Sequence, residues 1–231
     1  METTQVRLSK DFLSLISHDL KNPFNALLGL TDLLDKRYNQ FDDEGRIDLI
    51  RNINKSSKQL YQLIENMVLW LNLEAGRTRI TRKAISLREI LLENINFFSS
   101  SIDEKKLEIR DKVEKGEIIT DFSLCSSLFW NLLKLLIDSA VNNSIIELKS
   151  LFHSSSVEVQ LNYRGKEVFL GVQSLDDPCS PEGLTSGGRV YMGMSLGVCK
   201  RIVDFFGGSL CFTNKDKDNS IIISLPSNLE S

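Results

Sequence analysis

The length, composition and charge of the chain set the first limits on its fold and partners. With 231 residues, of which 42% are hydrophobic, the chain can bury sizeable cores, and we expect two domains. The formal net charge of −3 gives no overall attraction for nucleic acid or for an anionic membrane surface, so neither is expected as a partner.

Cysteine usage and the apolar runs exclude further classes of protein. The four cysteines are widely spaced and include no C-x-x-C pair, so we expect neither a metal site nor a disulfide framework. The N-terminal segment lacks the apolar core of a signal peptide, and no apolar run is long enough to cross a bilayer. These features predict a cytoplasmic protein with reduced thiols and no membrane insertion.

The first helix carries a histidine in a polar turn. Apolar residues recur at steps of three, four and seven along 12–34, which predicts an amphipathic helix over about 10–36. At about 100° per residue, His18 points away from this apolar stripe and lies one turn before Asn22. Pro23 removes a backbone donor just after the polar turn, so we expect a bend there. For a lone histidine, the simplest interpretation is a solvent-exposed surface residue.

A second amphipathic helix follows a short loop. Polar residues at 37–43 break the first pattern, and apolar residues at three- and four-residue steps along 47–71 predict a helix that ends at Gly76. Two such helices form an antiparallel hairpin. Because one hairpin cannot enclose its own apolar stripe, we predict that residues 1–76 form a homodimer with a four-helix bundle.

A second domain follows a basic, polar connector. We assign the connector to 77–85 and the second domain to 86–231. Helices are expected at about 87–98, 122–140 and 195–206, and strands at 107–113, 117–120, 157–161, 168–172, 209–213 and 220–225. A hairpin connection at 164–166 and a loop around His153, after an extended helix, complete the prediction. Helices alternating with mostly antiparallel strands indicate an α+β sandwich with helices on one face.

The polar turn of the first helix resembles a known motif. Residues 17–23, Ser-His-Asp-Leu-Lys-Asn-Pro, lie within Phe-Leu-x-x-Ile and are followed by Phe-x-x-Leu-Leu-Gly-Leu. This stretch closely resembles the H-box of two-component sensor histidine kinases. The resemblance implies that His18 accepts a phosphoryl group and exchanges it with an aspartate of a response-regulator receiver domain, whose own Mg²⁺ stabilises the charge.

The same resemblance gives roles to the neighbours of the histidine. Asp19 would orient the imidazole and act as a base, and Asn22 would position a water against the receiver's acyl phosphate. Lys21 would steer the phosphoryl group electrostatically. The helix surface below the histidine, which includes Phe24 and Leu28, would dock the receiver or belong to the core of the bundle.

The second domain resembles the catalytic and ATP-binding domain of the same kinases. Residues 196–210 and 221–226 match the helix, glycine stop and strands that close this domain. In the family, an asparagine on the N-box helix holds Mg²⁺ against the phosphates. Aligned from Asn131, that position is Leu135, which cannot ligate Mg²⁺, whereas a shifted alignment offers Asp138.

The other nucleotide motifs of the family are also altered in this sequence. The aspartate that receives the adenine amino group aligns with Ser174, and Asp176 and Pro178 replace the glycines that follow it. The glycine-rich element that packs against triphosphate survives in part, with Gly193 and Gly197. We therefore expect an ATP-binding fold that no longer uses ATP well.

Three functional hypotheses follow. The first is a histidine phosphotransferase of a phosphorelay, possessing a phosphatase activity and requiring no cofactor of its own. The second is an ATP-dependent sensor kinase core that uses Mg-ATP through divergent motifs. The third is a non-catalytic dimeric scaffold that binds a response regulator. Labelling of His18 by Mg-ATP distinguishes the first two.

Overall fold

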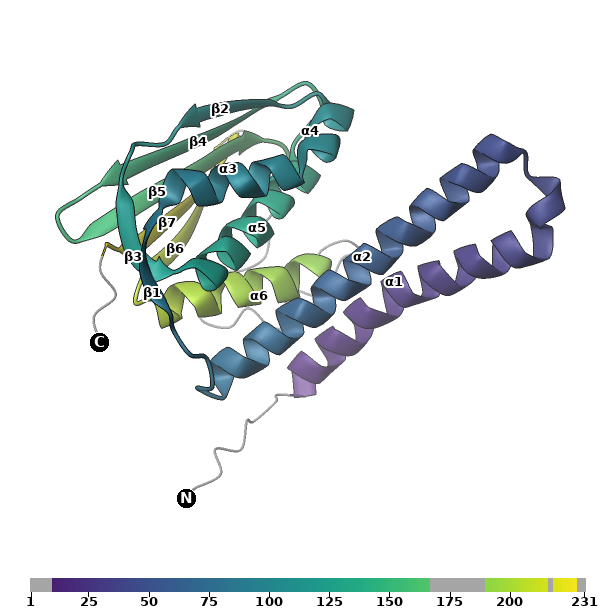
Figure 1. Cartoon of the computed structure of the whole chain (residues 1–231), viewed down its shortest axis with the longest axis horizontal. Helices are drawn as coiled ribbons and strands as arrows, with labels where there is room; N and C mark the ends of the chain where they lie inside the picture. The colour runs from purple at the N-terminus through teal and green to yellow at the C-terminus, as the bar shows by residue number, and fades with distance from the viewer. Residues whose placement is uncertain (1–9, 167–189, 216–217, 228–231) are drawn as a thin grey trace, which may run out of the picture.

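A long helical hairpin and a domain built on a sheet make up the structure (Figure 1). The computed structural model describes residues 10–166, 190–215 and 218–227, with 10–19, 190–194 and 214–215 described by their backbone only. In chain order the elements are α1 (Lys10–Arg37), the 3-10 helix η1 (Tyr38–Gln40), α2 (Asp43–Glu74), β1 (Arg82–Ser86), α3 (Leu87–Phe97), α4 (Ser99–Lys105), β2 (Glu108–Lys112), β3 (Glu117–Asp121), α5 (Phe122–Ser139), β4 (Ile145–Phe152), β5 (Ser156–Arg164), α6 (Val190–Phe205), β6 (Ser209–Lys215) and β7 (Asp218–Pro226).

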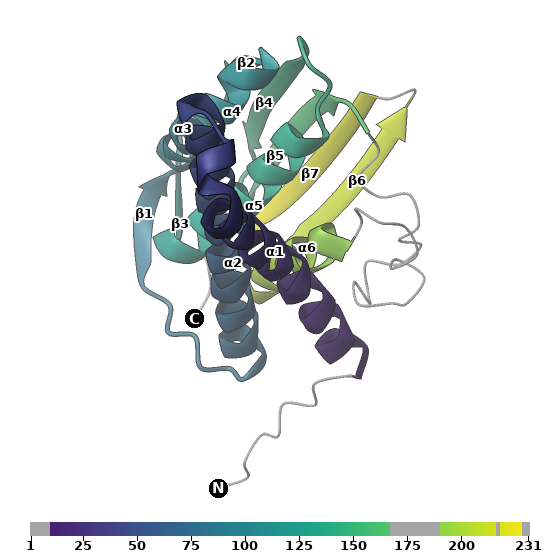
Figure 2. The same cartoon turned by 90° about the vertical axis from the view of Figure 1, so that its right-hand side faces the viewer.

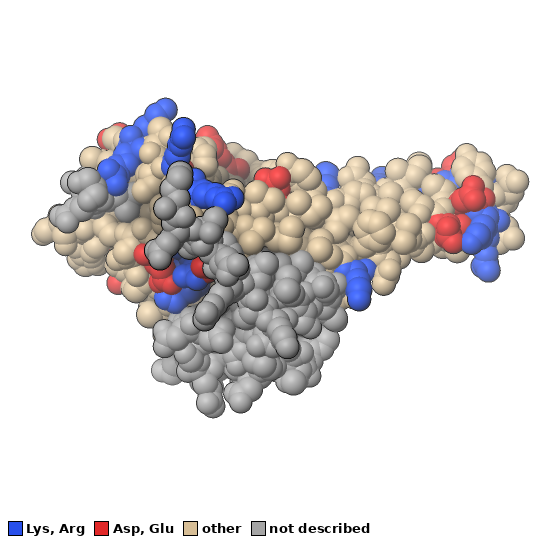
Figure 3. All heavy atoms as spheres, turned by 90° about the horizontal axis from the view of Figure 1, so that it is seen from below, with Lys and Arg blue, Asp and Glu red and all other residues tan. Residues whose placement is uncertain are grey.

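The hairpin confirms the two predicted amphipathic helices. Asp42 caps α2, because its carboxylate accepts a hydrogen bond from the N–H of Gly45 at 2.8 Å. At the tip, the guanidinium of Arg46 pairs with Asp43 at 2.8 Å and lies 4.4 Å from the centre of the Tyr38 ring. On the face seen in Figure 3, charged side chains gather at this tip, whereas the hairpin surface between the tip and the second domain is mostly uncharged.

The second domain is built on a five-stranded sheet with the strand order β2-β4-β5-β7-β6. The described strands pair antiparallel except for β2 and β4, and β1 and β3 form a separate two-stranded sheet. Helices α3, α5 and α6 cover one face of the larger sheet (Figures 1 and 2). The predicted α+β fold with helices on one face is therefore confirmed.

Strand β4 is absent from the sequence-based prediction, and its presence changes the strand pairing. Buried and more exposed residues alternate along this strand, with Ile146, Leu148 and Ser150 buried. In the sequence this pattern is too short and too polar to predict a strand. Strand β5 pairs with β4 along one edge and with β7 along the other. Because a strand has two edges, the predicted hairpin of 157–161 with 168–172 is wrong, and 168–172 lies outside the described residues.

Two further segments differ from the prediction. Strand β1 occupies the end of the expected connector and pairs with β3 of the second domain. His153 is exposed and in a loop as expected, but the loop joins β4 to β5 instead of following a helix. Its N–H donates to the carbonyl of Ser156 at 2.8 Å, which closes the turn.

The hydrophobic core lies between the helices and the larger sheet. It includes Leu63 of α2, so the hairpin packs directly on the second domain. Cys125 and Cys199 are free thiols buried in this core, and Cys211 is free and exposed. Burial raises the pKa of the Cys125 thiol to about 12 and also raises the pKa of Cys199, so both remain protonated and serve as core residues.

Candidate functional site

The polar turn of α1 lies at the end of the hairpin that packs against the second domain. Because α1 and α2 run antiparallel, the first half of α1 lies beside the last half of α2 (Figure 1). Helix α1 also contacts α6, and Leu20 packs against the core of the second domain. The segment that contains His18 is therefore held close to α6 (Figure 2).

The residues assigned to phosphoryl transfer follow one another along α1. His18 and Asp19 belong to the part of the helix that is described by its backbone only. In the next turn Lys21 and Asn22 are exposed, Pro23 is buried, and the helix continues past the proline. The structure thus brings the predicted site residues onto one helical stretch, with Lys21 and Asn22 at the surface.

Apolar side chains are exposed just below this turn. Phe24 and Leu28 are 48% and 50% exposed, and they lie one helical turn apart. Half-exposed aromatic and aliphatic side chains next to a polar turn are suited to contact with another protein.

Helix α5 carries the residues that align with the family's Mg²⁺-binding helix. Asn131 is buried, and it forms hydrogen bonds with Asn66 of α2. Leu135 is buried in the hydrophobic core. Asp138 is exposed at the end of the helix, where its carboxylate accepts a hydrogen bond from Lys134 at 2.8 Å. Asn131 therefore makes a contact between the domains, Leu135 packs in the core, and Asp138 forms a surface ion pair.

These described residues do not fit a Mg²⁺ site. Mg²⁺ requires oxygen ligands in near-octahedral geometry, and Leu135 offers no ligand atom. The amide of Asn131 is directed to the hairpin, and the carboxylate of Asp138 is paired with Lys134. Within the described part of the chain, no group of three or more His, Cys, Asp or Glu side chains could hold a metal ion.

The remaining residues of the predicted nucleotide site are only partly described. Ser174 lies outside the described residues, and Gly193 belongs to the backbone-only part of α6. Gly197 is buried in α6, and a Cβ atom there would meet no atom within 4 Å, so packing does not require a glycine at this position. The adenine and phosphate assignments therefore stay predictions.

Gly165 was placed by the sequence in a hairpin connection, but its close contact with α5 was not predicted, so this role was missed. It follows β5 directly, and its backbone forms a β-bridge with Ala140 at the end of α5. A Cβ atom on Gly165 would lie 2.2 Å from the carbonyl oxygen of Ser139, which is closer than such atoms can approach. A glycine immediately after an alternating strand was the available signal.

Lys105 was also missed, and it holds the same end of α5. Its ammonium group donates to the carbonyls of Ile137, Asp138 and Ala140 at 2.7, 2.8 and 3.1 Å. A cation at a helix C-terminus satisfies carbonyls that have no partner within the helix and interacts favourably with the helix dipole. No local sequence signal connects a lysine on α4 with the end of a helix more than 30 residues later.

Replacing Gly165 with alanine is expected to lower the free energy of unfolding by about 1–3 kcal/mol, because the added methyl group collides with the end of α5. Urea denaturation measures this loss. Gly29→Ala is the matched control, since a Cβ atom on Gly29 meets nothing within 4 Å and alanine favours a helix. Equal unfolding midpoints for the two variants would contradict the close approach.

Comparison with known proteins identifies the first domain. Residues 8–76 match the His Kinase A (phospho-acceptor) domain. The sensor protein KdpD of Clostridium acetobutylicum is 24% identical over 223 residues, which cover 96% of this chain and 25% of KdpD. The chain therefore spans about a quarter of the length of this relative.

Solved structures identify the fold of the whole chain. The Acinetobacter baumannii histidine kinase AdeS matches with a TM-score of 0.71 at 15% identity, covering 91% of this chain and 98% of AdeS. Histidine kinase ThkA, in its complex with the response regulator protein TrrA, matches with a TM-score of 0.70 at 16% identity, covering 96% of this chain and 63% of ThkA. The catalytic domain of ThkA alone matches with a TM-score of 0.55 at 18% identity over 65% of this chain and 99% of that domain.

The fold and the comparisons together show which proteins the chain is similar to. A His Kinase A domain is followed by an α/β domain with the fold of a histidine kinase ATPase domain. The chain has the organisation of a two-component sensor histidine kinase core, as the H-box resemblance implied. Among the helices that the structure describes, none is both long and apolar enough to span a bilayer.

Proposed function

We propose that the chain is a phosphoryl-transfer core of a two-component system and that His18 carries the phosphoryl group. The observation that carries this proposal is the match of residues 8–76 to the phospho-acceptor domain, with the H-box histidine on the helical stretch next to α6. An imidazole suits the role because its near-neutral pKa leaves much of it unprotonated and nucleophilic at cellular pH.

The neighbours of His18 are proposed to support the transfer. Asp19 orients the imidazole and accepts its proton while the N–P bond forms. The exposed amide of Asn22 positions a water for hydrolysis of a receiver's acyl phosphate. The exposed ammonium of Lys21 attracts the phosphoryl group during its approach.

The partner is proposed to be a response-regulator receiver domain. Phe24, directly after the polar turn, and Leu28, one helical turn later, offer an apolar contact surface. The structurally similar kinase ThkA is known in a complex with the response regulator protein TrrA, which supports a partner of this kind. The receiver would bring its own Mg²⁺ to neutralise the developing charge. We expect the exchange to occur in the cytoplasm.

The source of the phosphoryl group distinguishes two forms of this function. The comparisons support an ATP-dependent kinase at least as well as a phosphotransferase, because the matched proteins named above are sensor proteins or histidine kinases. The side chains of α5 favour a phosphotransferase, since Leu135 and Asn131 do not provide a Mg²⁺ site. In the form that we propose, the phosphoryl group therefore reaches His18 from a phosphorylated receiver.

Incubation with phosphorylated receiver domains is expected to move the label onto His18. Receivers are first labelled with acetyl phosphate, and transfer is followed as the acid-labile phosphohistidine on the chain. His18→Gln should take up no label, because the amide is not a nucleophile for phosphoryl transfer. Asn22→Ala should still take up label but slow dephosphorylation of the receiver at least about tenfold. A chain that binds receivers equally well with and without His18, and never takes up label, would be a non-catalytic scaffold.

Mg-ATP is expected to label His18 at least about 100-fold more slowly than a phosphorylated receiver does, because Leu135 occupies the position on α5 where the family has the ligand of the metal that neutralises the triphosphate. Radiolabelled ATP with the unmodified chain measures the rate, and His18→Gln gives the background. Comparable rates from ATP and from receivers would establish the kinase form instead.

A homodimer is the second part of the proposal, and the exposed side of α2 supports it. One side of α2 packs on α1 and another packs on the second domain. A third side, which we call the free apolar face, consists of Ile50, Tyr61, Ile64 and Val68, all of them exposed. Four large apolar side chains on one side of a helix are the pattern of a four-helix bundle that lacks its second hairpin.

Val68→Glu is expected to shift the chain from dimer to monomer, because it introduces a charge into the apolar interface. Sedimentation equilibrium measures the dimer dissociation constant, which should rise at least about tenfold. Val141→Glu is the matched control, because both valines are 46% exposed but Val141 lies in the second domain, away from the free apolar face. A dimer that tolerates both changes alike would place the interface elsewhere.

A further inference from the structure

Two buried asparagines connect the hairpin to the second domain. Asn66 of α2 is 3% exposed and Asn131 of α5 is 2% exposed. The side-chain N–H of Asn66 donates to Oδ1 of Asn131 at 2.9 Å, and that of Asn131 donates to Oδ1 of Asn66 at 3.2 Å. This reciprocal pair is a direct polar contact between α2 and α5.

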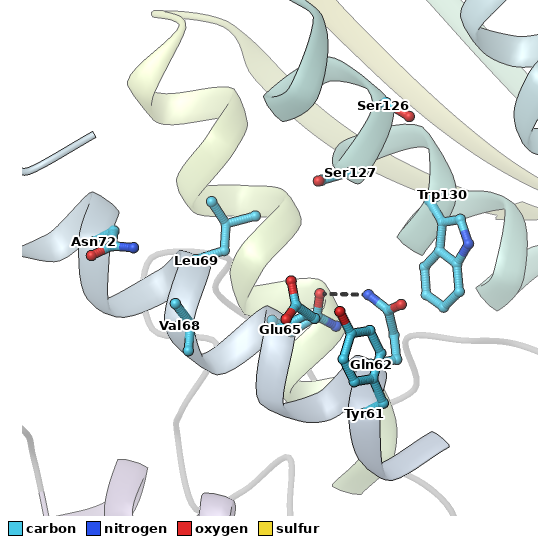
Figure 4. Close-up of a pocket in the computed structure, with 10 residues that line it drawn as sticks. Tyr61, Gln62, Glu65, Val68, Leu69, Asn72, Ser126, Ser127 and Trp130 are labelled. Atoms are coloured by element: carbon cyan, nitrogen blue, oxygen red, sulfur yellow. Dashed lines mark hydrogen bonds between the residues drawn. The ribbon is translucent and has the colours of Figure 1, made fainter. Parts of the chain in front are cut away.

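The surroundings satisfy the rest of both amides. Asn131 also donates to the carbonyl of Ser127 at 2.9 Å, and Asn66 donates to Oγ of Ser195 on α6 at 3.4 Å. Gln62 donates to Oδ1 of Asn66 at 3.3 Å (Figure 4). Because a buried amide without partners is costly, the network is stable only while α2, α5 and α6 are docked together.

Apolar contacts surround the pair but do not specify its position. Leu63 is part of the core, and Leu69, Trp70 and Leu73 pack against it. An ion pair of Glu74 with Arg201 of α6 lies at the end of the same interface. Apolar side chains tolerate sliding, whereas a slip of α2 by one residue turns Asn66 by about 100° and breaks both bonds between the two amides. The asparagine pair therefore selects one register of docking.

The docking is continuous with the segment of α1 that contains His18. Helix α6 receives the contact from Asn66 through Ser195 and also touches α1, where Leu20 packs against the core. The position of α6 beside the phospho-acceptor segment thus depends on the register of α2. A helix on one side of α1 also reduces the directions from which a partner domain can approach.

We propose that Asn66 and Asn131 form a polar lock that holds the second domain docked on the hairpin in one register, and that release of this lock speeds phosphoryl exchange between His18 and a receiver. The first half stands on the geometry alone. The second half rests on the proposed function of His18.

The lock is tested by a double-mutant cycle on the whole chain. Asn66→Leu and Asn131→Leu each remove the two reciprocal bonds and leave a buried amide with polar groups unsatisfied at the interface, so each single variant should raise the undocked fraction about tenfold. The double variant joins two leucines in an apolar setting and should restore docking. Asn94→Leu is the matched control, because Asn94 is a buried asparagine whose bonds, to Ile90 and Ser126, stay within the second domain.

The two tryptophans of the chain report docking directly, since Trp70 packs at the interface and Trp130 lines the groove between α2 and α5 (Figure 4). Undocking should shift their emission to the red and increase acrylamide quenching, with a larger radius of gyration by X-ray scattering. Single variants that stay docked, or a double variant that undocks as much as the singles, would overturn the lock.

Transfer from phosphorylated receivers tests the second half. The single variants should label His18 faster than the parent chain, and the double variant should return to the parent rate. An unchanged rate in a variant whose tryptophan emission shows undocking would overturn the link to exchange. If neither parent nor variants take up label, the proposed function fails, while fluorescence and scattering still decide whether the lock exists.

Discussion

Helix α5 is apolar around most of its circumference, so it needs partners on every side, and the rest of the chain supplies them. Ten of its residues are buried, against the sheet, α3, α6 and the hairpin. Its ends are held by Asp121, which caps the first turn, and by Lys105, which bonds the last carbonyls. Gly165 allows the chain after β5 to approach the same end closely. Helices α3 and α6 and the hairpin are positioned by the need to enclose this helix.

The same helix holds three residues that the sequence had connected with a nucleotide site, and each has a structural contact. The asparagine of α5 bonds the hairpin, a leucine fills the core, and the terminal aspartate forms a surface ion pair. These contacts are the basis on which we propose the phosphotransferase form. The hairpin, in contrast, keeps its polar turn intact, with Lys21 and Asn22 at the surface. The comparisons show the organisation of a histidine kinase core.

Much of the candidate site was predictable because its signals are local. The H-box occupies seven consecutive residues, and helical periodicity is enough to put His18 and Asn22 on adjacent turns. Asn131, Leu135 and Asp138 were named from the sequence, but their partners could not be. Asn66 is 65 residues from Asn131, and no periodic pattern relates two asparagines across that separation. Strand β4 was missed for a related reason, since three alternating buried positions do not outweigh the polar residues between them.

The sequence by itself determined the two long helices, the α+β character of the second domain and the place of His18, because periodicity and short motifs depend on neighbours in the chain. Only the tertiary structure decided the strand order, the need for glycine at 165 and the docking of α2 on α5 and α6. These features depend on which surfaces meet after folding. In particular, the sequence connected Asn131 with a nucleotide site, whereas in the structure it is the partner of Asn66. This pairing depends on burial and on directional hydrogen bonds between distant segments.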